Sequence, residues 1–225
     1  TFSQAESNAG NGGDISLSTS DGNISTSALT SISNALSTGT SLNGGDISLT
    51  ASGNIDVSDI QSSSFAENDT GNGGNIFIES STGEILIDDI SSESTATGDS
   101  AGNGGNVELN ANGRLRINND VSTSSIAVGD TSGQGGTIQI TGNEVIVEEL
   151  RSLSAASTNA GDAGFIDVTG QRVIRISGGI GAGSIGGENS ADIELTGNDI
   201  ALEGGSNTIV GNTVLLEPAS INQRI

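Results

Sequence analysis

The chain has 225 residues and a formal net charge of −22, and it contains no Cys, His, Met, Trp or Tyr. Its six cationic residues are all arginine, so it lacks the usual general base, the thiol nucleophile, thiolate and imidazole metal ligands, and disulfides. Such an acidic chain is poorly suited to nucleic acid or an anionic membrane, and no apolar run approaches the roughly 20 residues of a membrane span.

An internal repeat organises the chain. The segments GNGGDISL, NGGDISL, GNGGNIFI, GNGGNVEL, GQGGTIQI and GDAGFIDV recur, followed by the weaker copy NSADIEL. The first large apolar residues of these copies are Ile15, Ile47, Ile76, Val107, Ile138, Ile166 and Ile193, separated by 27 to 32 residues. A fixed period of this length indicates a repeat architecture.

Each copy begins with two short predicted strands. In the third copy, Ile76 and Ile78 alternate with polar residues, the turn SSTGE follows, and Ile85 and Ile87 then alternate in the same way. A period of two indicates β-strands with one buried face.

A third predicted strand follows and fixes the register. Counted from Leu29, Ile60, Ile90, Val121, Leu150 and Ile180, the residue four positions on is always serine: Ser33, Ser64, Ser94, Ser125, Ser154 and Ser184. Two positions further stand alanines, except for Gly186 in the sixth copy. The residues between these positions vary, so the strand has an inward and an outward face.

Three strands per copy, with like residues stacked between copies, predict an all-β, right-handed parallel β-solenoid (β-helix) of about seven coils of about 30 residues. We expect a single domain over residues 1–225, with regular coils over about 10–203 and an irregular terminal segment over 204–225. The GNGG motif is interpreted as corner geometry, where glycines permit a tight return of the chain. The sequence begins without an initiator Met or a signal peptide, so we expect the natural protein to be longer.

Acidic residues gather at the predicted turn after the second strand. We name as the acidic row the carboxylates and amides that align there: Asp59, Asp88, Asp89, Asn118, Asn119, Asp120, Glu148 and Glu149. Neighbouring coils are about 4.8 Å apart, so the row could share a calcium ion, which takes six to eight oxygen ligands. The alternatives are a solvated row of turn-favouring residues or, at this spacing, a glycosidase-like pair.

Other surface residues are weaker candidates for a functional site than the acidic row. Arg114, Arg116, Arg172 and Arg175 fall on the outward side or at the start of the second strand, and Arg116 is expected about one coil from Asp88 and Glu148. Salt bridges across the ladder are the simplest role for these arginines. Phe65 and Phe77 are the mid-chain aromatic residues predicted to point outward.

The combination of residues 71–76 (GNGGNI) with residues 90–96 (ISSESTA) resembles the repeat region of filamentous-haemagglutinin-like exoproteins. The resemblance covers roughly residues 10–200 and is strongest to the two-partner secretion type found in cyanobacteria. It implies export by an outer-membrane transporter and a secreted or cell-surface location.

We therefore expect a non-catalytic structural or adhesive rod segment of a large exoprotein, without a cofactor. The first alternative is a calcium-dependent module that binds glycans or cell surfaces, and the second is a polysaccharide lyase or hydrolase. No nucleic acid partner and no membrane insertion are expected.

Overall fold

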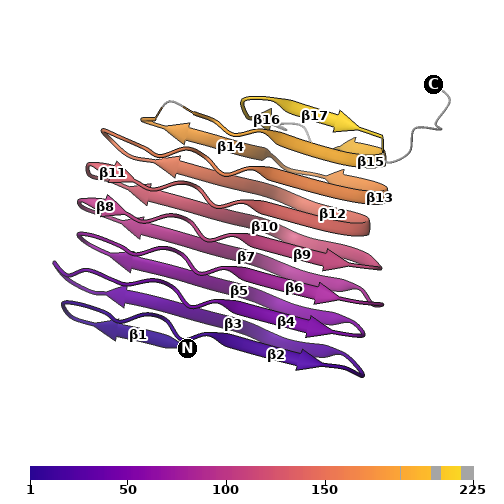
Figure 1. Cartoon of the computed structure of the whole chain (residues 1–225), viewed down its shortest axis with the longest axis horizontal. Coiled ribbons are helices and arrows are strands. Elements are labelled where there is room, and N and C mark those ends of the chain that lie inside the picture. The colour runs from indigo at the N-terminus through magenta and orange to yellow at the C-terminus, as the bar shows by residue number, and fades with distance from the viewer. Residues whose placement is uncertain (188, 204–208, 219–225) are drawn as a thin grey trace.

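The computed structural model describes residues 1–187, 189–203 and 209–218, and every regular element among them is a β-strand. The strands stack as successive rungs from the N-terminal to the C-terminal end (Figure 1). All strand pairs are parallel, and about seven turns follow one another at a spacing of about 30 residues. The predicted all-β parallel β-solenoid is confirmed.

Each coil has three walls, which we name by their order in the chain. The first wall contains β2 (Ile15–Thr19), β4 (Ile47–Ala51), β6 (Ile76–Ser80), β9 (Val107–Ala111), the starts of β12 (Ile138–Ala155), β13 (Ile166–Ile176) and β15 (Ile193–Leu202), and β17 (Val214–Glu217). Long strands supply the second wall and then the third: β3 (Ile24–Ala35), β5 (Ile55–Ala66), β7 (Ile85–Ala96), β10 (Arg114–Ala127) and the rest of β12. The third wall also contains β1 (Phe2–Ala5), β14 (Ile180–Ile185) and β16 (Ile209–Val210), and β8 (Ser100–Ala101) pairs with β11 (Thr131–Ser132) at the following corner.

The second and third predicted strands are continuous in most coils, which differs from the expected three separate strands. In β5, Val57 and Ile60 are both buried, and the residues between them, Ser58 and Asp59, lie at the surface. Two consecutive outward residues bend the chain without breaking its pairing with β7, which continues from Val57 to Ile60. The corner is therefore a bend within a strand, as at a β-bulge.

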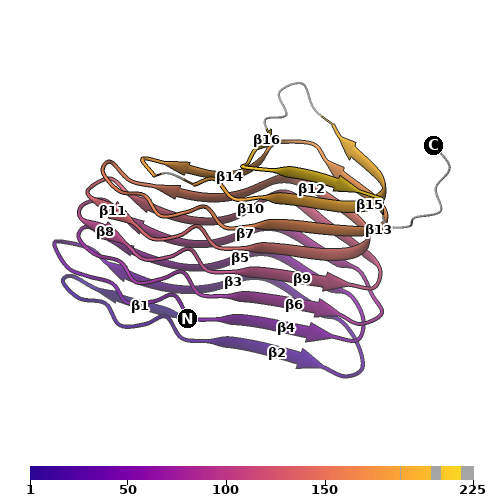
Figure 2. The ribbon, with the colours of Figure 1, turned by 45° about the horizontal axis from the view of Figure 1, so that its top comes forward.

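The walls stack above one another from coil to coil (Figure 2). The core consists of the inward side chains of the first and second walls and of the residues that begin the third wall, such as Ile60 and Ile90. The predicted apolar residues stack in register, as in the pairings of Ile47 with Ile76 and of Ile55 with Ile85. One continuous cluster of buried side chains extends from Ile47 to Leu195. Burial of these stacked aliphatic side chains is the main stabilising term of the coil.

The third wall is held by serine hydroxyls. Ser62 and Ser64 lie in register with Ser92 and Ser94, as the repeat predicts, and all four are fully buried. The serine two positions before the alanine column donates a hydrogen bond to a backbone carbonyl of the corner that precedes the first wall of its coil. These bonds join Ser33 to Gly10, Ser64 to Leu42, Ser94 to Gly71, Ser125 to Gly102, Ser154 to Gly133 and Ser184 to Gly161, at 2.5 to 2.9 Å. The hydroxyls of this column therefore have partners, which offsets their desolvation.

The GNGG glycines are required for close packing. A Cβ on Gly74 would press against the carbonyl of Gly45 and the hydroxyl of Ser62. Positive φ among the described residues occurs only at Gly22 and Gly186. The corner interpretation is thus supported, but the physical reason is the approach of two backbones rather than an unusual conformation.

The asparagines of the same motif connect one corner to the next. Asn43 Oδ1 accepts a hydrogen bond of 2.8 Å from the backbone N–H of Asn72, and Asn72 Oδ1 accepts one of 2.9 Å from Asn103. These bonds satisfy backbone N–H groups of the corner, which lie outside the strands of the first and third walls.

Some residues on the outward face of the third wall are buried, although the variation of residue type at these positions predicts that they are exposed. Ser63 is fully buried and Ser124 is 2% exposed, because larger residues of the neighbouring coils, such as Ile32 and Glu93, stand beside them in the ladder. The Ser63 hydroxyl has no hydrogen-bond partner, unlike every other buried side-chain polar atom in the described part of the chain.

The ladder extends beyond the expected regular coils. Residues 2–5 pair with Ile32 to Ala35, so the solenoid includes residues before position 10. In the segment expected to be irregular, β16 pairs with β14 and β17 pairs with β15. Residues 204–208 and 219–225 of that segment lie outside the described residues.

Two adjacent serines test the role of the hydroxyl bonds. Ser62 Oγ donates to the Gly45 carbonyl at 2.6 Å and accepts from the Gly74 N–H at 3.0 Å, whereas Ser63 Oγ is buried without a partner. We expect Ser62→Ala to lower the free energy of unfolding by about 1–3 kcal/mol, since it leaves buried groups unpaired. Ser63→Ala should leave stability unchanged or raise it slightly. Urea denaturation of both variants checks this, and an equal loss in both would contradict it.

A pair of glycines tests the close packing. Gly74→Ala places a methyl group against backbone, and we expect a loss of about 3 kcal/mol or more. The control is Gly181→Ala, where an added Cβ meets nothing within 4 Å and stability should change by less than about 1 kcal/mol. Thermal and urea unfolding of both proteins provide the measurement. Equal tolerance at the two positions would show that the corner can move apart.

Candidate functional site

The acidic row lies on the outside of the bend between the second and third walls. Asp59 pairs with Asp89 in β7, and Asp120 of β10 pairs with Glu149 of β12. The structure thus brings the predicted residues of four successive coils onto one line along the solenoid axis. They are outward because the bend requires consecutive residues that do not enter the core.

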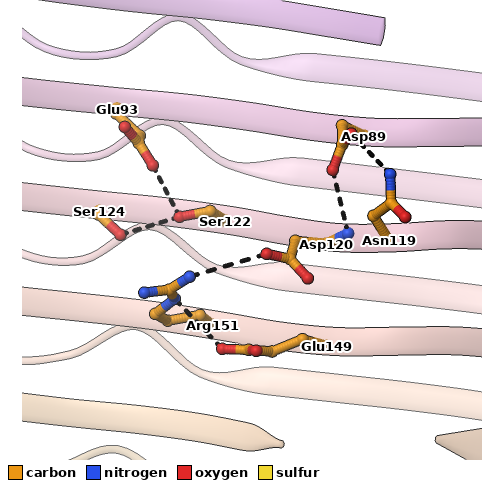
Figure 3. Close-up of polar contacts among 8 residues, drawn as sticks. All are labelled: Asp89, Glu93, Asn119, Asp120, Ser122, Ser124, Glu149 and Arg151. Atoms are coloured by element: carbon orange, nitrogen blue, oxygen red, sulfur yellow. Dashed lines mark hydrogen bonds and ion pairs between the residues drawn. The ribbon is translucent and has the colours of Figure 1, made fainter. Parts of the chain in front are cut away.

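The amides of β10 separate the carboxylates. Asn118 Nδ2 donates to Asp88 Oδ1 at 2.6 Å, and Asn119 Nδ2 donates to Asp89 Oδ2 at 2.9 Å. The backbone N–H of Asp120 also donates to Asp89 Oδ1 at 3.2 Å (Figure 3). The extra residue of β10 at this bend produces a shift of register between Ile117 and Val121 and exposes this third outward group.

Arg151 forms ion pairs with two carboxylates of the acidic row. Its Nη2 atom lies 3.8 Å from Asp120 Oδ2, and its Nε atom lies 3.5 Å from Glu149 Oε1 (Figure 3). The side chains of Arg151, Asp120 and Glu149 are 45%, 41% and 39% exposed. Water screens such pairs, so each contributes at most about 1 kcal/mol.

The predicted salt bridges of the second-strand arginines across the ladder are confirmed for Arg114 but not for Arg116. Arg116 Nε donates to Asn118 Oδ1 in its own strand at 2.7 Å and forms no ion pair with Asp88 or Glu148 among the described residues. Arg114 does form a salt bridge across coils, at 3.1 Å to Glu144. Arg172 and Arg175 form none within the part of the chain that the structure describes. Sequence reasoning missed Arg151 because it considered the arginines of the second strand, while Arg151 lies at the start of the third wall.

The polar network continues beside the acidic row. Ser122 Oγ donates to Glu93 Oε1 at 2.8 Å and lies 3.1 Å from Ser124 Oγ (Figure 3). Glu93 therefore has a neutral partner from the next coil, like Asp88 and Asp89. Alternation of carboxylates with amides or hydroxyls reduces repulsion between stacked charges.

The chemistry available to the acidic row follows from these partners. Calcium takes six to eight oxygen ligands, and the described residues include no group of three or more acidic side chains that could hold a metal ion. A glycosidase pair needs one carboxyl group with an elevated pKa and another that is ionised. Calcium binding and catalysis at the acidic row remain predictions for experiment.

Comparisons with family models, with curated proteins and with solved structures find no match for this chain. No helix that could span a membrane occurs in the described residues.

One carboxyl group outside the acidic row has a shifted pKa. Asp167 stands on the outward face of the first wall between Gln139 and Glu194, and burial raises its pKa above 3.8, an effect that a hydrogen bond with Thr169 partly opposes. The native state therefore binds the Asp167 proton more tightly than the unfolded state. This contribution to stability is complete below pH 3.8 and is lost as the pH rises through the raised pKa.

We expect Asp167→Asn to be more stable than the parent protein near pH 7, with a difference that shrinks as the pH falls through the raised pKa of Asp167 and disappears below pH 3.8. Urea midpoints measured across this pH range give the comparison. Asp56→Asn, at an exposed position of β5, controls for the loss of one negative charge. The same pH dependence in both variants would assign the effect to net charge rather than to burial.

Proposed function

We propose that the chain is a non-catalytic structural segment of a secreted or cell-surface exoprotein of the filamentous-haemagglutinin-like kind. Its coils would hold an adhesive region, or their own corner loops, away from the cell. Export through an outer-membrane transporter belongs to the same proposal, and the absence of cysteine is compatible with it.

The observation that supports this role is the unbroken stack of paired coils. Strand pairing runs from β1 to β17, and one aliphatic cluster joins the coils from Ile47 to Leu195. Each coil contacts only its neighbours, so length can be added coil by coil without a new core. Six steps of about 4.8 Å give a stack of roughly 30 Å.

Hydrogen exchange tests the structural role. A spacer must remain folded along its whole length, so we expect amides of β5, β7, β10 and β12 to exchange together and far more slowly than the corner loops. Fast exchange of the central coils at neutral pH would overturn the proposal.

A second candidate function is calcium-dependent binding to glycans or cells. The alignment of Asp59, Asp89, Asp120 and Glu149 on one line favours it over other binding functions. A glycan array and a whole-cell binding screen of the chain, with and without calcium, decide between this and the spacer.

For the spacer we expect no calcium-dependent binding. Saturable binding that is lost in the double variant Asp88→Ala with Glu148→Ala would instead establish the binding module. The control double variant, Asp56→Ala with Glu84→Ala, removes the same charge from exposed positions outside the acidic row. Turnover of any glycan would overturn both assignments and indicate an enzyme.

A further inference from the structure

A hollow of about 450 Å³ lies where the outward face of the third wall meets the corner loops of three successive coils. Its lining consists of Asn34, Ala35, Leu36, Phe65, Ala66, Glu67, Asn68, Thr95, Thr97 and Gly98. We call it the Phe65 hollow. It shares no residue with the acidic row, and its volume lies within the range of small-molecule sites.

An aromatic ring forms the apolar part of the Phe65 hollow. Phe65 stands in the ladder between Asn34 of β3 and Thr95 of β7, so its ring has an amide on one side and a hydroxyl on the other. Phe65 is half-buried, and Leu36 at the adjacent corner is 58% exposed. Asn34, Phe65 and Thr95 come from three different repeats, so it is the register between the coils that brings them side by side.

The polar groups around the ring are available to a ligand. The side chains of Asn34, Thr95 and Thr97 form no hydrogen bond within the described part of the chain. Asn68 Nδ2 donates to the Thr38 carbonyl at 2.7 Å, which leaves its Oδ1 atom as an acceptor. Glu67 adds an exposed carboxylate. The Phe65 hollow differs in this from the acidic row, where Asp88, Asp89 and Asp120 already have side-chain partners from neighbouring coils.

We infer that the Phe65 hollow binds a hexopyranose that carries no anionic group. A sugar ring presents an apolar C–H face, which suits the phenyl ring, and a rim of hydroxyls, which suits the amides and hydroxyls around it. An aliphatic ligand would leave these polar groups desolvated without partners. Acidic sugars are disfavoured by Glu67 and by the net charge of −22.

Titration of the folded chain followed by amide NMR tests this site. The probes are cellotriose, a glucosamine trimer and a galacturonate trimer. We expect saturable binding of cellotriose or of the glucosamine trimer with a dissociation constant of about 1 mM, with shifts confined to residues 34–36, 65–68 and 95–98. The galacturonate trimer should bind at least about tenfold more weakly.

Phe65→Ala should weaken the binding at least about tenfold. The matched control is Phe77→Ala, which removes a second outward ring, on the first wall between Ser48 and Glu108, and should leave the affinity unchanged. Both rings lie outside the core, and the exchange protection of the central coils shows whether each variant is folded.

Four results would overturn the inference. These are no saturation by cellotriose or the glucosamine trimer, an unchanged affinity in folded Phe65→Ala, an equal loss in Phe77→Ala, and equal binding of the galacturonate trimer. The inference goes beyond the structural role and can fail separately from it, because a stack that binds no sugar can keep its full exchange protection.

Discussion

The close approach of the third wall to the glycine-rich corner is the constraint on which the cross-section of this solenoid depends. Aliphatic side chains fill the space between the first and second walls, but beyond its first residue the third wall leaves room only for small side chains, the serines and alanines of its inward face. Ser62 joins the two segments by donating to Gly45 and accepting from Gly74. A larger side chain on either segment would separate them and would also expose the polar groups that they satisfy.

The same constraint explains why the repeat is so regular in some positions and so free in others. The side chain at an inward position must fit a fixed volume, and it packs on its counterparts in the coils above and below. A change in its size in one coil therefore disturbs the packing of two neighbouring coils. Outward positions are limited only by the neighbours beside them in the ladder. Chemistry that differs between coils is therefore confined to the outward face and the corner loops.

Much of this fold could be predicted from the sequence, because inward residues leave a period that a single chain displays. The serine column from Ser33 to Ser184 gave the correct register from the first coil to the sixth. The pairing of residues 2–5 was missed, although Ser3 and Ala5 match Ser33 and Ala35. That fragment is too short to show a period by itself.

The candidate sites were harder to predict, because they depend on neighbours across coils rather than on one repeat. The alignment of the acidic row follows from register, but its partners do not. Which arginine reaches Asp120 depends on the direction of a long side chain from the next coil, and Arg151 does so while Arg116 turns to Asn118. The Phe65 hollow needs loops of three coils, whose variable lengths hide their proximity in the sequence.

These contacts separate two kinds of polar surface on one scaffold. Stacked carboxylates at the spacing of a coil repel one another, and amides or an arginine in the next coil relieve that repulsion. At the acidic row, a cation from solution would therefore have to compete with Asn118, Asn119 and Arg151 for Asp88, Asp89, Asp120 and Glu149. Around Phe65, the amide of Asn34 and the hydroxyl of Thr95 have no such partner within the described residues, so a ligand there displaces water and no protein contact. We therefore expect a new molecule to bind more readily where the outward groups of the solenoid are unpaired within the described residues than where carboxylates are concentrated.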